Sequence, residues 1–461
     1  MDNENILHAP GHPPPFPEPS PLHRAVGASA LGNAVEWFDY GIYAYGLTYI
    51  SAALFPGDTE EAVLFALATF AISFLIRPLG GLFWGPLGDR IGRKSVLAMT
   101  ILLMAGATFA VGLIPSYEAV GFWAPAALVI LRMLQGFSTG GEYGGAATFM
   151  AEYAPDDRRG FYGSFLEFGT LAGFSLGAAL MLGYSLHLGD EAMHEWGWRI
   201  PFLIAGPIGL VGMYLRSKME DTPVFREEMA AAAERRPPGL GSLMRNHWRP
   251  LLVVSGLVVA LNVVNYSLLS YMPTYLQRRI GLSSDEALLV PIIGMVFMML
   301  FLPFAGALSD RVGRKPMWRW SLIGLLLLVV PLYMLIGTGF AGAIIGFMAL
   351  GLLYVPQLAT ISATFPAMFP TAVRFAGFAI AYNISTSIFG GTAPIVGSGL
   401  ISLTGDPLMP AYYMALACLV GLVALRFMPE TAGRSLREDP FAAESRAAQE
   451  KQGPAAITKN Q

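Results

Sequence analysis

The chain has 461 residues, of which 54% are hydrophobic and 13% are charged, and its formal net charge is −3. This composition, with its positive mean hydropathy, excludes a water-soluble globule, and the small net charge gives no sign of a nucleic-acid partner. The single cysteine, Cys418, excludes an internal disulfide and a thiolate metal cluster. The sequence therefore indicates a protein whose solvent is the lipid bilayer.

The chain begins with a polar tail and continues with apolar segments. Residues 1–24 are rich in proline, lack the features of a signal peptide and are expected to be disordered. Most of the apolar segments are near the roughly 20 residues needed to cross the hydrocarbon core of a bilayer. They lie near residues 26–50, 62–84, 96–115, 122–150, 161–187, 200–215, 250–275, 287–308, 318–337, 340–364, 373–402 and 409–428.

These segments predict an all-α membrane protein of twelve transmembrane helices in two pseudo-symmetric halves of six helices, residues 25–216 and 249–428. Residues 217–248 are rich in Arg, Glu and Pro, which is typical of a soluble linker. Residues 429–461 are expected to form a C-terminal tail. This tail is too short for the three or four heptads that a coiled coil requires, so the sequence gives no support for osmotic activation through a coiled coil.

A charged motif occurs once in each half, and we call it the cassette. The first cassette, residues 85–94, reads GPLGDRIGRK, and the second, residues 306–315, reads GALSDRVGRK. A duplicated unit with a short charged loop at the same place in each copy is typical of transporter halves. The repeat therefore predicts a protein that moves a solute across the membrane.

The basic residues predict the orientation of the chain. Arg77 and Arg132 lie inside predicted spans, and Arg199, Arg278 and Arg279 lie in loops on one side. All other Lys and Arg residues belong to the opposite side. Because cytoplasmic loops collect Lys and Arg, both termini, both cassettes and the linker are expected to be cytoplasmic.

Several motifs resemble those of the major facilitator superfamily. The cassettes resemble the loop between its second and third helices, which is repeated between the eighth and ninth. Residues 132–140, RMLQGFSTG, resemble its fourth-helix motif, and residues 429–436, PETAGRSL, resemble its usual exit from helix twelve. The resemblance covers the whole predicted bundle and implies the major facilitator fold.

Further motifs resemble the metabolite:proton symporter family within that superfamily. In the first half these are residues 32–40, 74–81, 135–143 and 198–202. Residues 269–276, 365–370 and 409–413 of the second half are most similar to the proline and glycine betaine transporters of that family. The resemblance implies proton-coupled uptake across a bacterial plasma (inner) membrane.

The charges inside the predicted spans are concentrated in the first half. Each costs about 2.5–3.5 kcal/mol at a helix centre unless it is paired or faces a wet cavity. Glu36 and Asp39 are three residues apart and share one helix face with Tyr40 and Tyr43. Desolvation favours the neutral form of a carboxyl group, whereas an approaching arginine favours the charged form. A buried carboxyl group is therefore poised to carry a proton. The candidate residues for proton coupling or substrate binding are Glu36, Asp39, Arg132, Glu142 and Glu167.

A buried ion pair that only locks helices together is the alternative for each of these charges. For Glu142 and Glu167 the lock and the proton path are equally supported, whereas two acids on one face exceed what Arg132 needs for a structural pair. Arg132 is the candidate switch. Arg77 could brace the cytoplasmic gate or grip a substrate carboxylate, and its position above the first cassette favours the brace.

The cassettes are candidates for gating. Their aspartates can pair with arginines and with helix ends across the two halves, which would hold the inner side shut. Charge topology alone does not explain why Asp and Gly recur at fixed offsets. The candidate gating residues are Arg77, Gly85, Asp89, Arg90, Arg93, Asp310, Arg311 and Arg314.

The second half presents polar stripes instead of charges. Asparagine and hydroxyl groups at this spacing either join helices, for about 0.6 kcal/mol each, or bind solute from the pore. A zwitterion also needs aromatic faces around its ammonium group, although any single aromatic residue is more often packing. The candidate cavity residues are Trp37, Tyr40, Tyr43, Asn262, Asn265, Tyr266, Tyr382 and Asn383.

Three functional classes remain open. The first is proton symport of a small zwitterion such as proline or glycine betaine, and the second is proton symport of a carboxylic acid of the dicarboxylate, citrate or shikimate type, which calls for more cations. The third is a receptor that binds solute without accumulating it. The chain has no nucleotide-binding Gly-rich loop and its six histidines have no metal-ligand spacing, so no enzyme activity, cofactor or metal is expected. The sequence identifies no protein partner.

Overall fold

The computed structural model describes residues 19–57, 59–91, 93–140, 142–217, 240–370, 373–437 and 440–441, and every regular element in these ranges is helical. Most of the predicted linker and much of both predicted tails lie outside these ranges. The first helix begins at Pro19, inside the stretch predicted to be a tail, and proline suits the first turn of a helix because its missing N–H is not needed there.

The described helices divide into two halves. Those of the N-terminal half are α1 (Pro19–Tyr45), α2 (Leu47–Leu54), α3 (Thr59–Ile91), α4 (Arg93–Val111), α5 (Tyr117–Val120), α6 (Trp123–Thr139), α7 (Glu142–Tyr153), α8 (Arg159–Leu188), α9 (Asp190–Ala192) and α10 (Arg199–Ser217). Those of the C-terminal half are α12 (Leu240–Asn246), α13 (Trp248–Asn265), α14 (Met272–Tyr275), α15 (Ser284–Val312), α16 (Arg314–Ile336), α17 (Phe340–Leu358), α18 (Ile361–Thr364), α19 (Arg374–Ser385), α20 (Ala393–Thr404) and α21 (Met409–Arg426).

These helices form the twelve predicted transmembrane segments. Eight of the described helical segments are long and apolar enough to cross a membrane, and two shorter apolar helices, residues 98–111 and 199–214, fill the third and sixth positions. The first and fourth segments, α1 with α2 and α6 with α7, have a weaker apolar signal. They carry Glu36, Asp39, Arg132 and Glu142, so the charges that suggest function also reduce the apolar character of those two segments.

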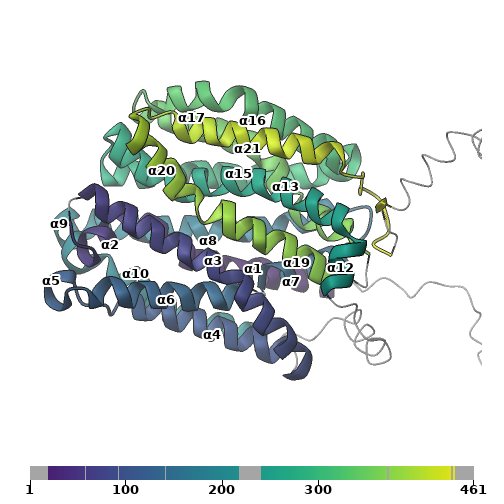
Figure 1. The fold of residues 1–461 in the computed structure, drawn as a ribbon, viewed down its shortest axis with the longest axis horizontal. Coiled ribbons are helices and arrows are strands. Elements are labelled where there is room, and N and C mark those ends of the chain that lie inside the picture. Colours follow the sequence, from purple (N-terminus) through teal and green to yellow (C-terminus); the bar gives the residue numbers. More distant parts are fainter. Residues whose placement is uncertain are drawn as a thin grey trace, which may run out of the picture.

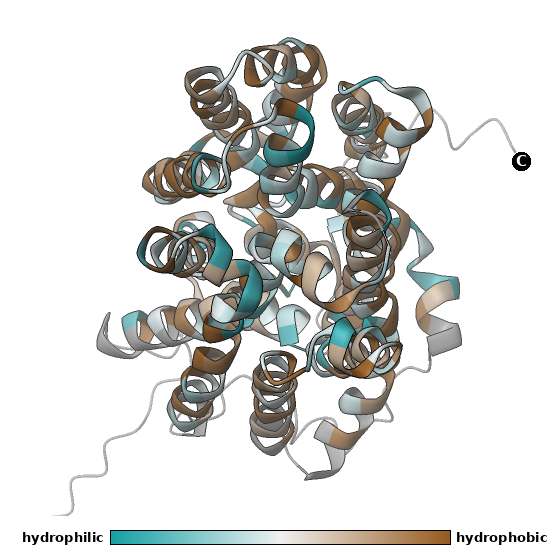
Figure 2. Ribbon diagram, turned by 90° about the vertical axis from the view of Figure 1, so that its left-hand side faces the viewer, coloured by the Kyte–Doolittle hydropathy of each residue, from teal (hydrophilic) through white to brown (hydrophobic). Residues whose placement is uncertain are grey.

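The two halves lie side by side along the bundle. Figure 1 shows the purple and blue helices α1–α10 on one side and most of the green and yellow helices, among them α15, α16, α17 and α21, on the other, while α19 lies against α7 and α3 of the first half. The contact between them is made mainly by α8 against α15, and by α3 against α19, α20 and the turn between those two helices. Seen end-on in Figure 2, the helices are brown over much of their surface, as expected for helices that face lipid.

Glycine residues bring helix backbones into contact within the N-terminal half. A Cβ atom at Gly169 or Gly173 of α8 would lie 2.1 or 2.3 Å from a backbone oxygen of α1. At Gly136 of α6 a Cβ atom would lie 1.7 Å from the carbonyl oxygen of Ser73 in α3. Side chains larger than hydrogen do not fit at these positions, and small residues serve this purpose in membrane bundles. This close packing fixes the neighbours of the buried charges.

Two membrane segments of the C-terminal half contain π-helical turns. The seventh segment does so at Tyr266–Tyr271 and again at Leu276–Ile280, and the eleventh does so at Thr386–Gly390. π-helical turns are frequent at functional sites because they redirect side chains. The turn at Tyr266–Tyr271 lies against α1, and the turn at Thr386–Gly390 lies against α3.

Candidate substrate and proton sites

Arg77 lies about halfway along α3, beside Glu36 of α1. Arg77 Nη2 is 3.5 Å from Glu36 Oε1, and the two side chains are 0% and 3% exposed. Gly140, at the end of α6, allows α3 to come this close, because a Cβ atom there would lie 2.1 Å from the carbonyl oxygen of Arg77. Within the described part of the chain, Nε, Nη1 and Nη2 of Arg77 have no hydrogen-bond acceptor. A buried guanidinium of this kind suits a ligand that brings acceptors.

Four aromatic rings surround this ion pair, and we call them the aromatic box: Trp37, Tyr40, Phe74 and Tyr266. The Phe74 and Tyr266 rings are 5.0 Å apart, Tyr40 and Phe74 are 5.0 Å apart, and Trp37 and Tyr266 are 6.2 Å apart. Arg77 Cζ lies 5.3 Å from the Phe74 ring and 5.8 Å from the Tyr40 ring. The buried hydroxyl of Tyr266 also has no hydrogen-bond partner among the described residues. The box therefore combines ring faces with unused polar groups.

Arg132 of α6 lies in a separate polar cluster whose members bond to one another. Its Nη1 donates to Gln135 Oε1 at 2.8 Å, and its Nη2 donates to Ser73 Oγ at 3.1 Å. Gln135 Nε2 in turn donates to Thr108 Oγ1 at 2.7 Å. The Arg132 guanidinium lies 4.2 Å from the centre of the Tyr43 ring. Both terminal nitrogens of Arg132 therefore already donate hydrogen bonds, and its Nε has no acceptor among the described residues.

Asp39 and Glu142 lie near this second cluster. Asp39 of α1 is next to Thr108 and interacts electrostatically with Arg132 and Glu142. Glu142 lies in the first turn of α7 and accepts a hydrogen bond from Thr100 at 2.5 Å. A helix N-terminus stabilises a negative charge, so Glu142 has a helix end as well as a hydroxyl to stabilise it.

Glu167 of α8 lies in a third environment, at the contact between the halves. Tyr143 of α7 donates a hydrogen bond to Glu167 Oε1 at 2.5 Å, and the Tyr143 ring stacks on Tyr382 of the other half at 4.4 Å. Asn33 of α1 donates to the carbonyl oxygen of Leu166, the residue before Glu167, at 2.8 Å. Glu167 is only 3% exposed.

The asparagines of the C-terminal half have different partners. Asn262 donates to Thr386 Oγ1 at 2.9 Å, and Asn265 accepts from Tyr354 OH at 3.0 Å, so both bond within their own half. Asn383 donates to the carbonyl oxygen of Gly140 at 2.9 Å and therefore bonds to the N-terminal half, next to Arg77.

At one end of the bundle, the second cassette contacts the other half, and we call this the cassette end. Asp310 accepts hydrogen bonds from the backbone N–H groups of Gly160 and Phe161, at 2.8 and 2.9 Å, in the first turn of α8. It also accepts from Arg314 Nη2 at 2.6 Å, whereas Arg311 is exposed. An aspartate at a helix N-terminus satisfies unpaired N–H groups and the helix dipole together.

The first cassette is only partly described. Gly85 and the neighbouring backbone belong to α3, but the side chains of Asp89, Arg90 and Arg93 lie outside the described part of the chain.

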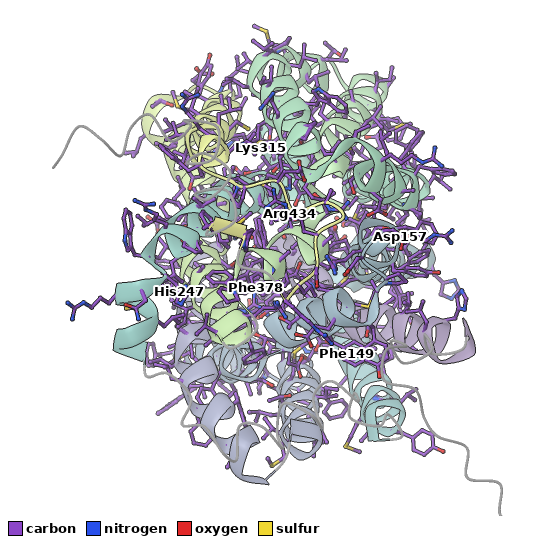
Figure 3. The ribbon with its side chains drawn as sticks, turned by 90° about the vertical axis from the view of Figure 1, so that its right-hand side faces the viewer. Phe149, Asp157, His247, Lys315, Phe378 and Arg434 are labelled. Atoms are coloured by element: carbon purple, nitrogen blue, oxygen red, sulfur yellow. The ribbon has the colours of Figure 1, made fainter. Side chains whose placement is uncertain are left out.

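The segment after α21 crosses the cassette end. Glu430 accepts from the backbone N–H groups of Arg314 and Lys315, at 2.8 and 3.0 Å, at the start of α16. Farther along, the carbonyl oxygen of Arg434 accepts from Arg159 of α8 at 3.1 Å, and that of Leu436 accepts from Arg374 of α19. Figure 3 shows this segment at Arg434, between Lys315 of one half and Phe149 of the other. The segment thus contacts both halves.

The opposite end is bridged by other groups. Arg279 Nη2, at the end of the seventh segment, lies 2.8 Å from Glu60 Oε1 at the start of α3. Ser402 of α20 donates to the same carboxylate oxygen at 2.9 Å. Ser185 of α8 donates to Asp285 of α15 at 2.7 Å. Both ends of the contact between the halves are therefore closed by polar bonds.

The structure divides the predicted stripe of Glu36, Asp39, Tyr40 and Tyr43. Glu36 lies with Arg77, and Asp39 and Tyr43 lie with Arg132. The Tyr40 ring lies between the two guanidinium groups, 5.8 Å from Arg77 Cζ and 5.5 Å from Arg132 Cζ. The sequence favoured a gate brace for Arg77, but its position in the aromatic box fits the other interpretation, a grip on a carboxylate.

Several residues at these sites were not predicted from the sequence. Phe74 was hidden in an apolar run, and Tyr143 lay next to Glu142 in a motif without being singled out. Arg279 did carry a signal, since it is one of the few basic residues in the predicted outer loops. The unpredicted residues are Glu60, Phe74, Tyr143, Arg159, Arg279, Arg374 and Glu430.

Comparison with known proteins agrees with this architecture. The family model of the Major Facilitator Superfamily matches residues 30–391. The chain is 44% identical over 426 residues to the glycine betaine/proline/ectoine/pipecolic acid transporter OusA of Dickeya dadantii, an alignment covering 90% of this chain and 85% of the relative. It is 43% identical over 435 residues to the ectoine/proline transporter ProP of Corynebacterium glutamicum, covering 91% and 86%.

A solved structure shows the same fold. The proton:xylose symporter XylE bound to 6-bromo-6-deoxy-D-glucose superimposes with a TM-score of 0.71 at 20% identity, covering 92% of this chain and 99% of that one. Twelve helices in two halves, a cassette in each half and relatives that are transporters along nearly the whole chain lead to one conclusion. The chain belongs to the Major Facilitator Superfamily and is a multi-pass membrane transporter of small solutes.

Proposed function

We propose that the protein takes up a small zwitterion, such as proline or glycine betaine, together with protons by alternating access. The observation that carries the proposal is the buried Arg77 guanidinium, which lies between Glu36 and the aromatic box and whose N–H groups have no acceptor among the described residues. The names of the curated relatives, which are transporters of proline, betaine and ectoine, support the same class of solute.

The chemistry of the site suits both ends of a zwitterion. Arg77 presents a planar fork of donors, and a carboxylate binds such a fork through two parallel hydrogen bonds. An ammonium group is attracted to ring faces, and Trp37, Tyr40 and Tyr266 provide these next to the carboxylate of Glu36. Arg132, the partner expected from the sequence, is a weaker candidate because Gln135 and Ser73 already accept its hydrogen bonds.

Charge balance separates this proposal from carboxylic acid uptake. Arg77 and Glu36 form a pair of opposite charges, and a zwitterion adds no net charge to the buried site. A dicarboxylate or citrate would bring at least two negative charges to one arginine that already faces a carboxylate, which is costly without further cations. Uptake of a carboxylic acid is therefore the second candidate function.

The two bridged ends serve as the gates of the alternating-access cycle. In this proposal the cassette end is cytoplasmic, because basic residues concentrate there, and it is held by Asp310 on the N-terminus of α8. The outer end is held by Glu60 and Arg279. Opening one gate while the other stays closed exposes Arg77 to one side at a time, and the proton gradient supplies the energy.

Uptake of radiolabelled proline and glycine betaine by cells that express the chain tests the proposal. We expect accumulation that a protonophore abolishes and that excess succinate does not inhibit. Arg77→Gln should reduce uptake at least tenfold at low substrate concentration, because a charge-assisted hydrogen bond contributes about 1.5–3 kcal/mol. Arg319→Gln, a change on an exposed arginine, is the matched control. Uptake that is inhibited by succinate, or that resists the protonophore, would contradict the proposal.

Labelling of introduced cysteines tests the orientation. The single native thiol, Cys418, is buried, so it gives little background. A membrane-impermeant maleimide should label Glu118→Cys, in the exposed loop helix α5, on intact cells. It should label Arg437→Cys, at the cassette end, only after the cells are opened. The reverse pattern would invert the proposed topology.

A further inference from the structure

Resting on the proposed proton symport, we infer that Glu167 is the group that binds the transported proton and that Tyr143 positions it. Proton symport needs an acid that gains a proton on one side of the membrane and releases it on the other. Among the described residues, four buried carboxyl groups lie inside the spans of the N-terminal half, and their surroundings differ in the way this role requires. These groups are Glu36, Asp39, Glu142 and Glu167.

Three of the four lie beside a group that favours a negative charge. Glu36 lies 3.5 Å from the Arg77 guanidinium, and Asp39 interacts electrostatically with Arg132. Glu142 lies at the N-terminus of α7, where the helix dipole favours a negative charge. An adjacent arginine opposes protonation of a carboxyl group, and Glu167 faces no such cation within the described part of the chain.

Glu167 has hydroxyl partners instead. Tyr143 donates to Glu167 Oε1 at 2.5 Å, and Thr170, one turn along α8, also interacts with this carboxyl group. An ionised carboxylate buried among neutral groups is costly, whereas the protonated acid fits there. The Glu167 carboxyl group can therefore stay buried while it carries the proton. When the proton leaves, water must enter the site or the site must rearrange.

The other elements packed on α8 bring no cation to Glu167 within the described part of the chain. From α7, α17 and α19 the titratable groups facing it are phenols, Tyr143, Tyr354 and Tyr382. From α1 comes the neutral amide of Asn33. The charged groups of α15 lie at its two ends, where Asp285 bonds to Ser185 and Asp310 bonds to the start of α8.

The position of Glu167 also links it to the substrate site. The Tyr143 ring, held by its hydrogen bond to Glu167, stacks on Tyr382 of the opposite half with an interplanar angle of 17°. Tyr382 interacts electrostatically with both Glu167 and Arg77. Loss of the proton changes the Tyr143 contact, and that contact is part of the surface on which the two halves meet. A proton at Glu167 and a carboxylate at Arg77 therefore act on the same rings.

The step is a simple proton transfer. A proton from the outer solution binds the Glu167 carboxylate, the halves rearrange with zwitterion bound, and the proton leaves to the cytoplasm. One positive charge crosses the membrane with each zwitterion, so uptake generates an inward current.

The test uses the purified full-length protein in liposomes, with radiolabelled proline as the probe and a pH dye inside the vesicles. Wild type should show proline-driven proton entry, and exchange of labelled for unlabelled proline without any gradient. Glu167→Gln should abolish the proton signal and gradient-driven accumulation while exchange continues. Glu191→Gln, an exposed acid at the opposite end, is the matched control and should behave as wild type.

The outcomes distinguish a failure of the proposed symport from a failure of the assignment of the proton to Glu167. No proton entry in wild type with proline or glycine betaine would defeat the proposed symport itself. A proton signal that persists in Glu167→Gln, or one that Asp39→Asn abolishes while exchange continues, would overturn the assignment to Glu167.

A second variant guards against misfolding. Tyr143→Phe keeps the stacked ring and removes only the hydroxyl, so it should remain folded and exchange proline. We expect it to move the pH midpoint of uptake to higher pH, because the carboxylate loses a donor that stabilised its charged form. A tyrosine with a purely structural role would leave the pH profile unchanged, so an unchanged profile would contradict the positioning role.

Discussion

Arg77 and Arg132 are two buried arginines on adjacent helices of the same half, yet their surroundings are opposite. Arg132 donates to Gln135 and Ser73 and lies over the Tyr43 ring. Arg77 faces one carboxylate at 3.5 Å, and its N–H groups have no acceptor among the described residues. The difference indicates that a charge whose hydrogen bonds are already made belongs to the scaffold. A charge whose hydrogen bonds are unused is the one that we propose binds the solute.

The largest effect is expected from adding a side chain at the close contact between α3 and α6. Gly140→Ala would place a Cβ atom 2.1 Å from the carbonyl oxygen of Arg77 and 2.6 Å from Gly81 N, so the helices must separate. We expect a loss of about 3 kcal/mol or more and little folded protein in the membrane, measured by fluorescence-detected gel filtration. Gly145→Ala, whose Cβ atom would meet only the Phe375 ring at 3.7 Å, is the control. Wild-type amounts of active Gly140→Ala protein would show that the spacing is adjustable.

Removing each buried pair of charges should affect stability differently. Arg132→Gln with Asp39→Asn leaves Gln135 and Ser73 without their donor and should cost about 2–3 kcal/mol in thermal unfolding without substrate. Arg77→Gln with Glu36→Gln removes two charges that are 3.5 Å apart, and the Arg77 nitrogens have no acceptor among the described residues, so stability should change by less than about 1 kcal/mol. Only the second double variant should lose stabilisation by added proline. Equal costs would erase the distinction between the two arginines.

Changing Glu36 alone should alter selectivity. Glu36→Gln leaves the positive charge of Arg77 without its counter-charge, so simple carboxylate anions become better ligands and zwitterions worse ones. We expect proline affinity to fall by about tenfold, the value of one charge-assisted contact, while acetate begins to compete. Competition uptake assays measure both changes. If acetate does not compete with proline in the Glu36→Gln variant, Glu36 does not set the charge of the site.

The smallest effect is expected at Ser73, which serves the Arg132 cluster. Ser73→Ala removes one acceptor from Arg132 Nη2 and should lower stability by about 1 kcal/mol, measured by thermal unfolding in detergent. Proline affinity should stay unchanged, because Arg77 does not use this hydroxyl. A marked loss of affinity would place Ser73 in the solute site.

The sequence predicts the fold well because its signals are local. Apolar length, the repeated cassettes and the distribution of basic residues are each visible along the chain, and they give twelve helices in two halves. The positions of Glu36 and Asp39 on one face of a helix are equally local.

The division of roles between Arg77 and Arg132 is not local. It depends on which partners neighbouring helices bring to each guanidinium, such as Gln135 and Ser73 for Arg132, and therefore on helix rotation and on the close approach at Gly136 and Gly140. The Tyr143 bond to Glu167 spans two helices for the same reason. Such pairings follow from packing and cannot be obtained from the periodicity of one segment.

The segment after α21 also affects how the chain is completed during synthesis. The buried guanidinium groups of Arg159 and Arg374 belong to α8 and α19, but carbonyl groups that they bind are supplied by Arg434 and Leu436. Those acceptors leave the ribosome after all twelve membrane segments have been made. Until then both arginines lack a bond that they have in the finished protein. A nascent chain that stops after α21 is thus chemically distinguishable from the complete one, because Arg159 and Arg374 then keep only the partners that α7, α8 and their neighbours supply.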